Sequence, residues 1–558
     1  MAQVRSGSGR PASPRGTERA NSRAIVFSET ILAANLAALE HAQGQRPTVA
    51  ALSPERTRAV ADDNVGVRLE LRTPAGTWTA LESPVATALP RQLFVIGPAL
   101  GAVLDTVDRA GASTRVVALE PDPSVAALLL AFRDWTPWIA QGRLCVLTGP
   151  DYRGAMNCGR FVDVSVPPTV LVSPALAAHR ADEVAAAQAV ATRLIAEAEA
   201  NANARARFAG RYLLQTLTNL PVIAREGDAA SLDGLFAGRP AIVVGAGPSL
   251  DDNLPTLAAL QDRAVVIGVD TALRPLLAGG VRPHLVAGVD PAELNAQHLA
   301  GVDGLDDVWL AAEGSLHPSA FGGFAGRTFV FKVSDHDPWP WLRTVGLDRG
   351  GLRAWGSVVT SAFDLAQRLG CNPIVFAGLD LSYPVRRPYC ANTIYDDTWR
   401  AAIATYGCTW EALVDDYFGR LADLRVPDVH GAPVLTTPHL VSFRDWLRQQ
   451  IAADTSRRVI NATGAGIMHG PRVAHASLHE ALADAAPLGR HVPDALRAAH
   501  AASVSRDQRL RPAVAGLVRH ARRRRSAPLL NRWIDFSAGK VTAAQILDAL
   551  STALQRSA

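Results

Sequence analysis

The sequence predicts an α/β protein with two Rossmann-like, doubly wound parallel-sheet domains, a helical segment that joins them, and a helical C-terminal region. The main observation is a repeated pattern: short apolar runs end in Gly or an acidic residue, and helical stretches separate them. Strands that alternate with helices form parallel sheets covered on both faces. The length of 558 residues leaves room for about three or four domains of roughly 150 residues each.

Composition excludes several classes of protein. Hydrophobic residues make up 48% and charged residues 19%, which is enough for a large core and argues against global disorder. The net charge of +4 argues against a dedicated nucleic-acid binder. No apolar run reaches the roughly 18 residues of a membrane span, and the N-terminus has no apolar signal core. We therefore expect a cytoplasmic protein.

Cysteine and lysine usage narrows the chemistry further. The five cysteines never form a CxxC pair, which argues against a zinc ribbon or a disulfide framework and favours a reducing compartment. The two lysines are Lys332 and Lys540, and the SAGKVT context of Lys540 lacks the P-loop pattern. Walker-type phosphate binding is excluded.

The sequence of the first 175 residues predicts a tail followed by one α/β domain. Residues 1–25 are polar and rich in Arg and Ser, typical of a disordered tail, and residues 26–175 form the N-terminal Rossmann-like domain. Within that domain we expect strands at 92–97, 115–120 and 143–149 and a helix at 102–111. Gly97, Gly101 and Glu120 have a spacing that nucleotide-binding folds share, but we favour a packing scaffold here.

Residues 176–232 predict a helical linker. Within it, 181–221 is rich in Ala, Arg and Glu and predicts a long helix or a helical pair. Apolar positions recur at helical spacing, but the high content of charge favours a mainly solvated face.

The central domain is predicted at 233–470, followed by a helical C-terminal region at 471–558. SVVTSAFDLAQRLG, residues 357–370, predicts an amphipathic helix that Gly370 closes. The six expected strands lie at 241–245, 264–270, 284–290, 308–313, 328–333 and 373–380.

The strongest local signal is VVGAGPSLDD, a strand followed by a glycine turn and a helix. Its turn contains Gly245, Gly247, Pro248 and Ser249, and Ser249 with Asp252 fits a capping box. Backbone N–H groups at such a turn favour an anion, typically a phosphate. The alternative is a plain strand-to-helix turn, since the acidic residues at the helix start already complement its dipole.

Acidic residues follow three other expected strands. Asp270 follows the second strand, Asp290 the third, and Asp380 with Tyr383 the last. Ligands of open parallel sheets bind beyond the carboxyl ends of the strands. A single aspartate there is usually a cap or turn residue, but three beside a glycine turn predict a site that holds a ribose, orients a base or takes a proton.

The segment AWGSVVTSA places Gly356, Ser357 and Thr360 at a further helix start. Ser357 is either an ordinary N-cap or part of a second set of donors that faces the same crevice.

Taken together, these residues resemble the motility accessory factor (Maf) glycosyltransferases, a bacterial family implicated in attaching nonulosonic (sialic-acid-like) sugars to flagellin. The resemblance is clearest from about 205 to 470. Its segments are NLPVIAREGD, PAIVVGAGPSLDDNLPTL, DTALRPLLAGGVRPHLVAGVDP, GSVVTSAFDLAQRLGCNPIVFAGLDLSY, HLVSFRDWLRQQI and VINATGAGI.

The central domain also resembles bacterial CMP-sialic acid sialyltransferases, which implies a cradle for a CMP-linked sugar donor and no required cofactor or metal. Their glycine turn matches Gly247 to Ser249, and their polar residues match Asp270 and Asp290. Ala246 replaces their usual Asn, and RRPYCANTIYDDTWR lacks their catalytic histidine. His284, Asp290 and Asp380 therefore remain candidates for the general base, with His284 more typical of a structural residue.

The same domain is similar to archaeal-type 6-hydroxymethylpterin diphosphokinases (MptE-like), which use acidic residues to hold Mg²⁺ and ATP. The resemblances together imply a glycosyltransferase that moves a nonulosonic sugar from a CMP-activated donor to Ser or Thr of flagellin or another surface protein. The alternatives are a diphosphokinase-like pyrophosphotransferase and a non-catalytic protein that binds flagellin or an export partner.

Overall fold

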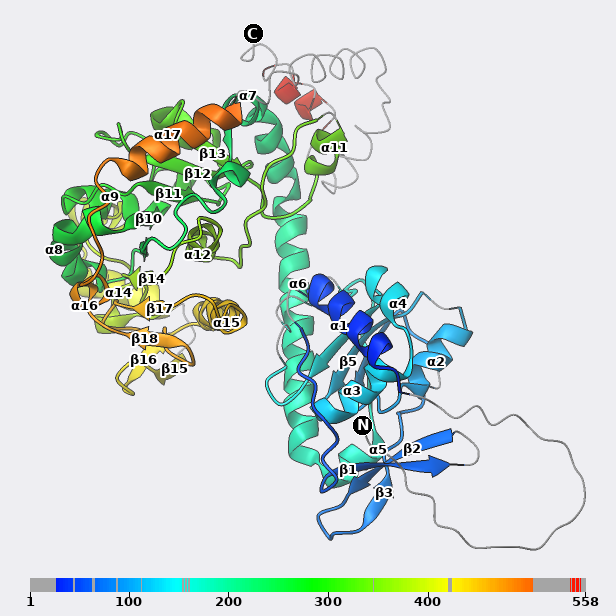
Figure 1. The fold of residues 1–558 in the computed structure, drawn as a ribbon. Coiled ribbons are helices and arrows are strands. Elements are labelled where there is room, and N and C mark those ends of the chain that lie inside the picture. The colour runs from blue at the N-terminus through cyan, green and yellow to red at the C-terminus, as the bar shows by residue number, and fades with distance from the viewer. Residues whose placement is uncertain are drawn as a thin grey trace, which may run out of the picture. The chain divides into compact units, whose positions relative to one another are not determined.

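The computed structural model describes residues 27–504, apart from short gaps at 44–45, 63–65, 87–88, 112, 153–154, 156–157, 159–160, 345 and 420–423, and part of 542–552 (Figure 1). The chain divides into two compact units, Met1–Ala202 and Asn203–Ala558. The predicted tail at 1–25 lies outside the described residues, as does most of the chain after 504.

The first unit contains a four-stranded parallel sheet with the strand order β6-β5-β4-β7. The three strands predicted from sequence are confirmed, because continuous apolar runs fill both faces of a covered sheet. The fourth strand, β7, was not predicted, since its residues are exposed or half-buried at the sheet edge. The bounds are β4 Gln92–Ile96, β5 Arg115–Glu120, β6 Leu144–Thr148 and β7 Thr169–Val172.

Helices cover this sheet, and a small antiparallel sheet accompanies it. This antiparallel sheet has the strand order β1-β2-β3. Gly97 has φ +70°, and a Cβ there would lie 2.3 Å from Leu176, which supports the packing interpretation. The remaining elements are α1 Glu29–Gln43, β1 Thr57–Asp62, β2 Gly66–Arg72, β3 Trp78–Ala80, α2 Ala102–Arg109, α3 Pro123–Phe132, α4 Thr136–Ala140 and α5 Pro174–His179.

A 38-residue helix, α6 (Ala181–Thr218), crosses the division between the units, and α7 (Leu220–Arg225) follows it. The expectation of a mainly solvated face is wrong for its first half. Small and branched side chains at helical spacing belong to the core of the first unit, since Ala residues allow close approach to the sheet. They are Val184, Ala187, Ala191, Leu194 and Ala198.

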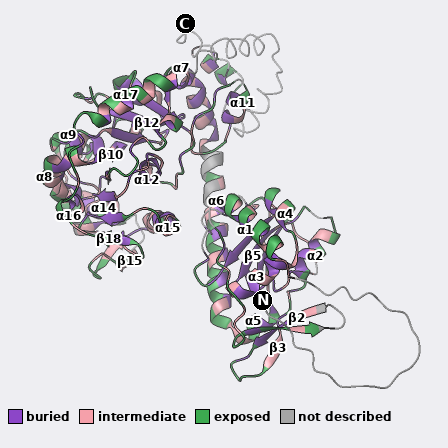
Figure 2. Cartoon of the chain, in the orientation of Figure 1, coloured by how far each residue is buried: buried purple, intermediate pink, exposed green. Residues whose placement is uncertain are grey.

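The second unit is built on a nine-stranded parallel sheet with the order β18-β17-β14-β9-β10-β11-β12-β13-β8. All six predicted strands are confirmed, and their residues are buried (Figure 2). The bounds are β8 Gly227–Asp228, β9 Ala241–Val244, β10 Val265–Val269, β11 Leu285–Gly288, β12 Trp309–Glu313, β13 Thr328–Phe331, β14 Ile374–Ala377, β17 Val459–Asn461 and β18 Val473–His475.

The direction of the chain reverses beside β9. Strands β10 to β13 extend to one side of β9, and the chain then returns to place β14, β17 and β18 on the other side. Helix α12 (Val358–Arg368) packs across β9, β10 and β11, while α8 (Leu250–Leu260) and α16 (Leu478–Ala481) pack together on the other face (Figure 1). A ligand crevice is expected beyond the carboxyl ends of β9 and β14.

The predicted helix closed by Gly370 is confirmed, since Gly370 follows α12 with φ +79°. Helix α17 (His491–Val504) packs on β8. The other elements of this unit are η2 Ala229–Leu232, η3 Gln261–Arg263, η4 Asp270–Ala272, α9 Leu273–Ala278, α10 Glu293–Ala296, η5 Pro318–Phe324, α11 Trp339–Thr344, η6 Pro384–Arg386, α13 Ile394–Tyr406, α14 Trp410–Gly419, β15 Leu424–Pro427, β16 Pro433–Thr436 and α15 Pro438–Ala453.

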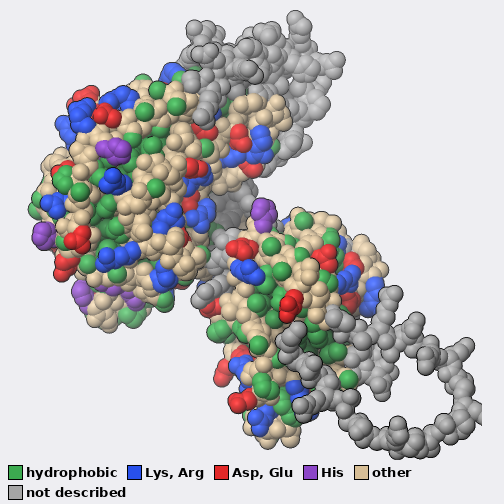
Figure 3. All heavy atoms as spheres, in the orientation of Figure 1, with side chains coloured by type: hydrophobic (Ala, Val, Ile, Leu, Met, Phe, Trp, Pro, Cys, Tyr) green, Lys and Arg blue, Asp and Glu red, His purple; other side chains and the backbone are tan. Residues whose placement is uncertain are grey.

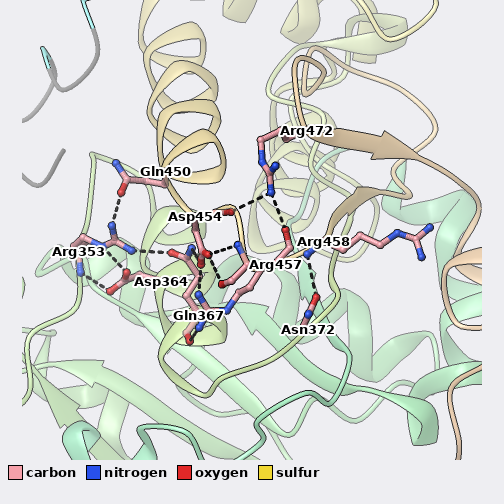
Figure 4. A network of polar contacts seen from close by, with 10 residues as sticks. Arg353, Asp364, Gln367, Asn372, Gln450, Asp454, Arg457, Arg458 and Arg472 are labelled. Carbon is pink, nitrogen blue, oxygen red and sulfur yellow. Dashed lines mark hydrogen bonds and ion pairs between the residues drawn. The ribbon is translucent and has the colours of Figure 1, made fainter. Parts of the chain in front are cut away.

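A network of arginines ties α12, α15 and the start of β17 together (Figure 4). Arg353 donates to Asp364 over 2.6 Å and also bonds to Gln450 of α15. Arg457 pairs with Asp454 and donates to the main-chain oxygen of Gln367 over 2.9 Å. These contacts lie where the strands begin, so they brace the edge of the sheet opposite the expected crevice.

Candidate functional site

The sheet brings the predicted acidic residues to one edge. β9, β10, β11 and β14 are parallel, so the chain leaves all four at the same end. Beyond β9 lies the turn that contains Gly245, and beyond the other three lie Asp270, Asp290 and Asp380. Because β9 and β14 are neighbours at the reversal of the chain, the glycine turn and Asp380 lie next to each other at this edge.

A hydrogen-bonded contact joins the glycine turn to the end of β14. Ser249 donates to Oδ2 of Asp380 from its hydroxyl over 2.7 Å and from its N–H over 3.2 Å. The predicted capping box is therefore wrong, because the Ser249 side chain caps no N–H of α8. Asp380 Oδ1 has no hydrogen-bond partner among the described residues. Burial raises the pKa of Asp380 to about 6, and the bonds from Ser249 limit that rise.

The position of the Asp380 carboxylate also explains why residue 247 is a glycine. A Cβ on Gly247 would lie 2.0 Å from Asp380 Oδ2 and 2.8 Å from the main-chain oxygen of Gly378. Glycine is needed here because a carboxylate approaches the backbone. A Cβ on Gly245 would likewise lie 2.6 Å from the Gly378 oxygen.

Three N–H groups of the turn that was predicted to bind phosphate donate to other parts of the protein. The N–H groups of Gly245 and Gly247 donate to Ala377 and Gly378, and the N–H of Ser249 donates to Asp380. Pro248 has no N–H, and its carbonyl accepts from Asp251. A carboxylate of the protein thus takes the position that the prediction gave to an anion.

Asp270 is the most strongly perturbed group on the adjoining strand. It is 2% exposed and begins η4 directly after β10. Its Oδ1 accepts from the N–H of Thr271 over 2.7 Å, while Oδ2 is without a partner in the described part of the chain. Burial raises the pKa of Asp270 to about 7, and the charge of Asp290 adds to this rise. A carboxyl group with this pKa can hold or release a proton near neutral pH.

Asp290 is half-buried and lies within electrostatic range of Asp270. Its Oδ1 accepts from the N–H of Ala292 over 2.8 Å, which fixes the carboxylate in a tight turn. The pKa of Tyr395 is raised by burial, and the charges of Asp270 and Asp290 contribute to the rise. Tyr395 stacks on Tyr389 with ring centroids 4.5 Å apart. The two carboxylates and this tyrosine pair therefore lie close enough to influence one another electrostatically.

Comparison with known proteins agrees with this part of the sequence analysis. Residues 214–386 match the family described as 6-hydroxymethylpterin diphosphokinase MptE-like. This region is similar to the MptE-like family. The predicted resemblance to that family is confirmed, and the matched residues include every predicted site residue, from Gly245 to Tyr383.

Among solved structures, the chain is similar to the MAf glycosyltransferase from Magnetospirillum magneticum AMB-1. The identity is 16%, the TM-score is 0.46, and the similarity covers 94% of this chain and 90% of that one. No curated protein matches the sequence significantly.

Within the MptE-like region, the start of α12 reaches the same edge as the aspartates. Gly356 has φ +66°, and a Cβ there would lie 2.7 Å from the ring of Phe443. Ser357 is half-buried and makes no side-chain cap. Thr360 is buried, donates to the Ser357 carbonyl over 2.6 Å and accepts from the N–H of Trp355 over 2.8 Å. Thr360 therefore supports the turn, and of these residues only Ser357 has a hydroxyl available to a ligand.

Two predicted site residues make packing or main-chain contacts instead of facing the aspartates. His284 precedes β11, so it lies at the beginning of the strand, and its Nδ1 accepts from the N–H of Val266 over 3.0 Å. Burial lowers its pKa to about 4. Tyr383 packs against Phe418, with ring centroids 5.1 Å apart, in an apolar cluster under α14. The place of His284 at the beginning of β11 contradicts its assignment to catalysis, whereas the packing of Tyr383 gives its ring a structural role and leaves its assignment to donor binding a prediction.

Sequence reasoning missed Tyr389 and Tyr395. Tyr389 lies between η6 and α13, and Tyr395 lies in the first turn of α13. Two aromatic residues that flank a half-buried turn are a weak signal, and their stacking depends on the fold of the loop. The described residues contain no group of three or more His, Cys, Asp or Glu side chains arranged to hold a metal ion. In the same residues, no helix is long and apolar enough to cross a membrane.

Proposed function

We propose that this protein is a glycosyltransferase that moves a nonulosonic sugar from a CMP-activated donor to a Ser or Thr hydroxyl of flagellin or another surface protein, in the cytoplasm. The observation that carries the proposal is the pair of carboxylates beside the chain reversal. Asp270 is buried with an unpartnered oxygen, and Asp290 is half-buried in front of the same edge. Because the two carboxylates have different environments, one can bind the substrate while the other transfers a proton.

In this proposal Asp290 is the general base, because it is the more accessible of the two. It takes the proton from the acceptor hydroxyl as the hydroxyl oxygen attacks the anomeric carbon. The bond from that carbon to the phosphate oxygen breaks, and CMP leaves with the electron pair. Asp270 contacts the ribose, the base or the sugar through its unpartnered oxygen.

The phosphate of the donor needs hydrogen-bond donors other than the N–H groups of Gly245, Gly247 and Ser249, which are already engaged. We assign this role to the Ser357 hydroxyl at the start of α12 and to the hydroxyl of Tyr395. A helix start also contributes a favourable dipole for a negative charge. Asp380 then acts as a positioning residue that holds the Ser249 turn.

The family match favours a second candidate, a 6-hydroxymethylpterin diphosphokinase-like pyrophosphotransferase. Such an enzyme needs ATP and Mg²⁺, with acidic side chains as ligands. Asp270 and Asp290 would then bind the metal ion instead of the sugar donor. A third candidate is a protein that binds flagellin or an export partner without catalysis.

Ligand-dependent thermal stability and intact-mass analysis of the acceptor separate these candidates. We expect CMP to raise the Tm in the presence of EDTA and ATP to have a smaller effect, because a ligand at 100 times its Kd stabilises the folded state by about 2.7 kcal/mol. A shift that requires ATP and Mg²⁺ would favour the diphosphokinase. A CMP shift without mass transfer to any supplied acceptor would favour the non-catalytic protein.

The matched variants are Asp290→Asn and Glu293→Gln. Each removes one carboxylate, and Glu293 is exposed on α10 three residues further along the chain. Sugar transfer should fall at least 100-fold in Asp290→Asn and stay unchanged in Glu293→Gln, consistent with typical contributions of about 10²–10⁴ from a general base. Equal transfer by both variants would remove Asp290 from the mechanism.

A further inference from the structure

A cavity of about 530 Å³ lies in the second unit beyond the carboxyl ends of β17 and β18. Its walls come from α8, from the two strand ends, from the start of α16 and from the turn at 429–430. The segment INATGAGI, which the proposed function does not use, supplies one wall. The lining residues are Asn253, Thr256, Val429, His430, Asn461, Ala462, Gly464, His475, Ala476, Ser477, Leu478 and His479.

Three histidines from separate segments line this cavity, namely His430, His475 and His479. All three are exposed, and Figure 3 shows histidine side chains gathered on the surface where Figure 1 places α16 and β18. His430 Nε2 lies 3.0 Å from the Gly464 carbonyl, a contact that orients the ring. Nδ1 of the same ring is then available to a ligand.

The remaining polar walls are already hydrogen-bonded. Asn461 donates to the Met468 carbonyl over 2.9 Å and accepts from Thr463. Asn253 accepts from the N–H of Gly378 over 3.2 Å. These amides therefore shape the cavity, and the imidazoles are left as its titratable groups.

The carboxylates near the cavity are either occupied or outside its lining. Asp428 accepts from the N–H groups of His430 and Ala432, and Glu480 accepts from the N–H and hydroxyl of Ser477. Asp252 on α8 is exposed and does not belong to the lining. Among the described lining residues the only ionisable side chains are imidazoles, so protonation makes the cavity positive.

The histidines also influence one another. The pKa of His475 is lowered by partial burial and by the neighbouring His469 and His430, since like charges repel. An anion placed among these rings would offset that repulsion and favour their protonated forms. Protonation of these histidines and binding of an anion should therefore favour each other.

We propose that this cavity is an anion site that binds a phosphate group, either as free phosphate or as a small phosphomonoester, through His430, His475 and His479. Protonated imidazoles donate charge-assisted hydrogen bonds to phosphate oxygens. The volume of about 530 Å³ also accommodates a sugar-sized body attached to the phosphate. None of Asp270, Asp290 and Asp380 lines this cavity, so its lining differs from the residues assigned to the proposed donor site.

The test is calorimetric titration of the full chain with sulfate, inorganic phosphate and ribose 5-phosphate at constant ionic strength. Sulfate keeps its charge between pH 6 and pH 8, so any change in its affinity reports on the protein. We expect sulfate to bind about tenfold more tightly at pH 6 than at pH 8, because a lower pH favours protonated imidazoles, which donate charge-assisted hydrogen bonds to the anion. Tighter binding of ribose 5-phosphate than of phosphate would identify an organic phosphomonoester as the ligand, and equal binding would identify free phosphate.

The test variants are His475→Gln and the double variant with His479→Gln, and the matched control is His41→Gln, an exposed histidine of α1 in the first unit. Each test substitution replaces an exposed side chain, so folding should persist, and an unchanged Tm checks this. We expect the double variant to lose at least about tenfold in phosphate affinity at pH 6 and the control to lose nothing. Undiminished binding in the double variant, or no binding to the unaltered chain, would overturn the proposal.

The outcome is independent of the proposed glycosyltransferase activity. The CMP-dependent rise in Tm should persist in the His475→Gln and His479→Gln variants, and phosphate binding at the histidines should persist in Asp290→Asn. If one of the two proposals is refuted, the measurement for the other proposal can therefore still be interpreted.

Discussion

The contact between the glycine turn and Asp380 makes Gly247 the most informative position for mutation. Gly247→Ala adds one methyl group, and that carbon would lie 2.0 Å from Asp380 Oδ2. It would also lie 2.8 Å from the Gly378 carbonyl oxygen, which belongs to the backbone and cannot rotate away. The carboxylate must therefore move, and β9 and β14 must separate slightly.

The cost follows from the hydrogen bonds that Asp380 would lose. Its Oδ2 accepts from the Ser249 hydroxyl over 2.7 Å and from the Ser249 N–H over 3.2 Å. Hydrogen bonds to a charged group contribute about 1.5–3 kcal/mol each, and the displaced carboxylate would stay buried without them. We expect Gly247→Ala to reduce the free energy of unfolding by about 3–5 kcal/mol and the Tm by on the order of 10 °C.

The assay is thermal unfolding followed by near-ultraviolet circular dichroism, with Gly322→Ala as the control. A Cβ on Gly322 would meet no atom within 4 Å, so that variant should retain the Tm of the unaltered protein. Asp380→Ala removes the clashing carboxylate, so the double variant with Gly247→Ala should be more stable than the sum of the single effects allows.

Two results would refute this reasoning. One is equal stability of Gly247→Ala and Gly322→Ala, which would mean that the turn tolerates a Cβ. The other is strict additivity of Gly247→Ala and Asp380→Ala, since residues in direct contact should show a coupling energy of about 0.5–3 kcal/mol.

Three further predictions concern titration, catalysis and the C-terminal helix. The pKa of Asp270 is about 7 in the folded protein and near 3.9 in an unfolded chain, so the native state binds the extra proton and stability falls as pH rises from about 4 to 7. Asp270→Asn should remove this part of the pH dependence and raise the Tm at pH 8, measured by thermal unfolding at pH 5 and pH 8. His284→Gln should lower the Tm while leaving the KM for the CMP-sugar unchanged, and a raised KM would return His284 to the site. His500 bonds over 3.1 Å to Glu226, which is 1% exposed, so His500→Ala should cost about 2–4 kcal/mol in urea unfolding and His500→Gln, which retains a donor, should cost less.

The elements of the parallel sheets could be predicted from sequence because each is a local pattern. VVIGV at β10 is apolar throughout, since a strand covered on both faces buries every side chain. Gly370 closes α12 because its left-handed backbone suits glycine. The short strands β17 and β18 were missed, since three residues each give too little periodicity to distinguish a strand from a loop.

The sequence by itself determined which residues follow the strands, and so which carboxylates could share an edge. It did not determine which of them meet. Ser249 and Asp380 are 131 positions apart, and their contact exists because β14 returns beside β9 after four intervening strands. Whether the glycine turn receives a phosphate or a carboxylate of the protein therefore depended on strand order, because hydrogen bonds between distant segments form only where packing of the whole sheet brings them together.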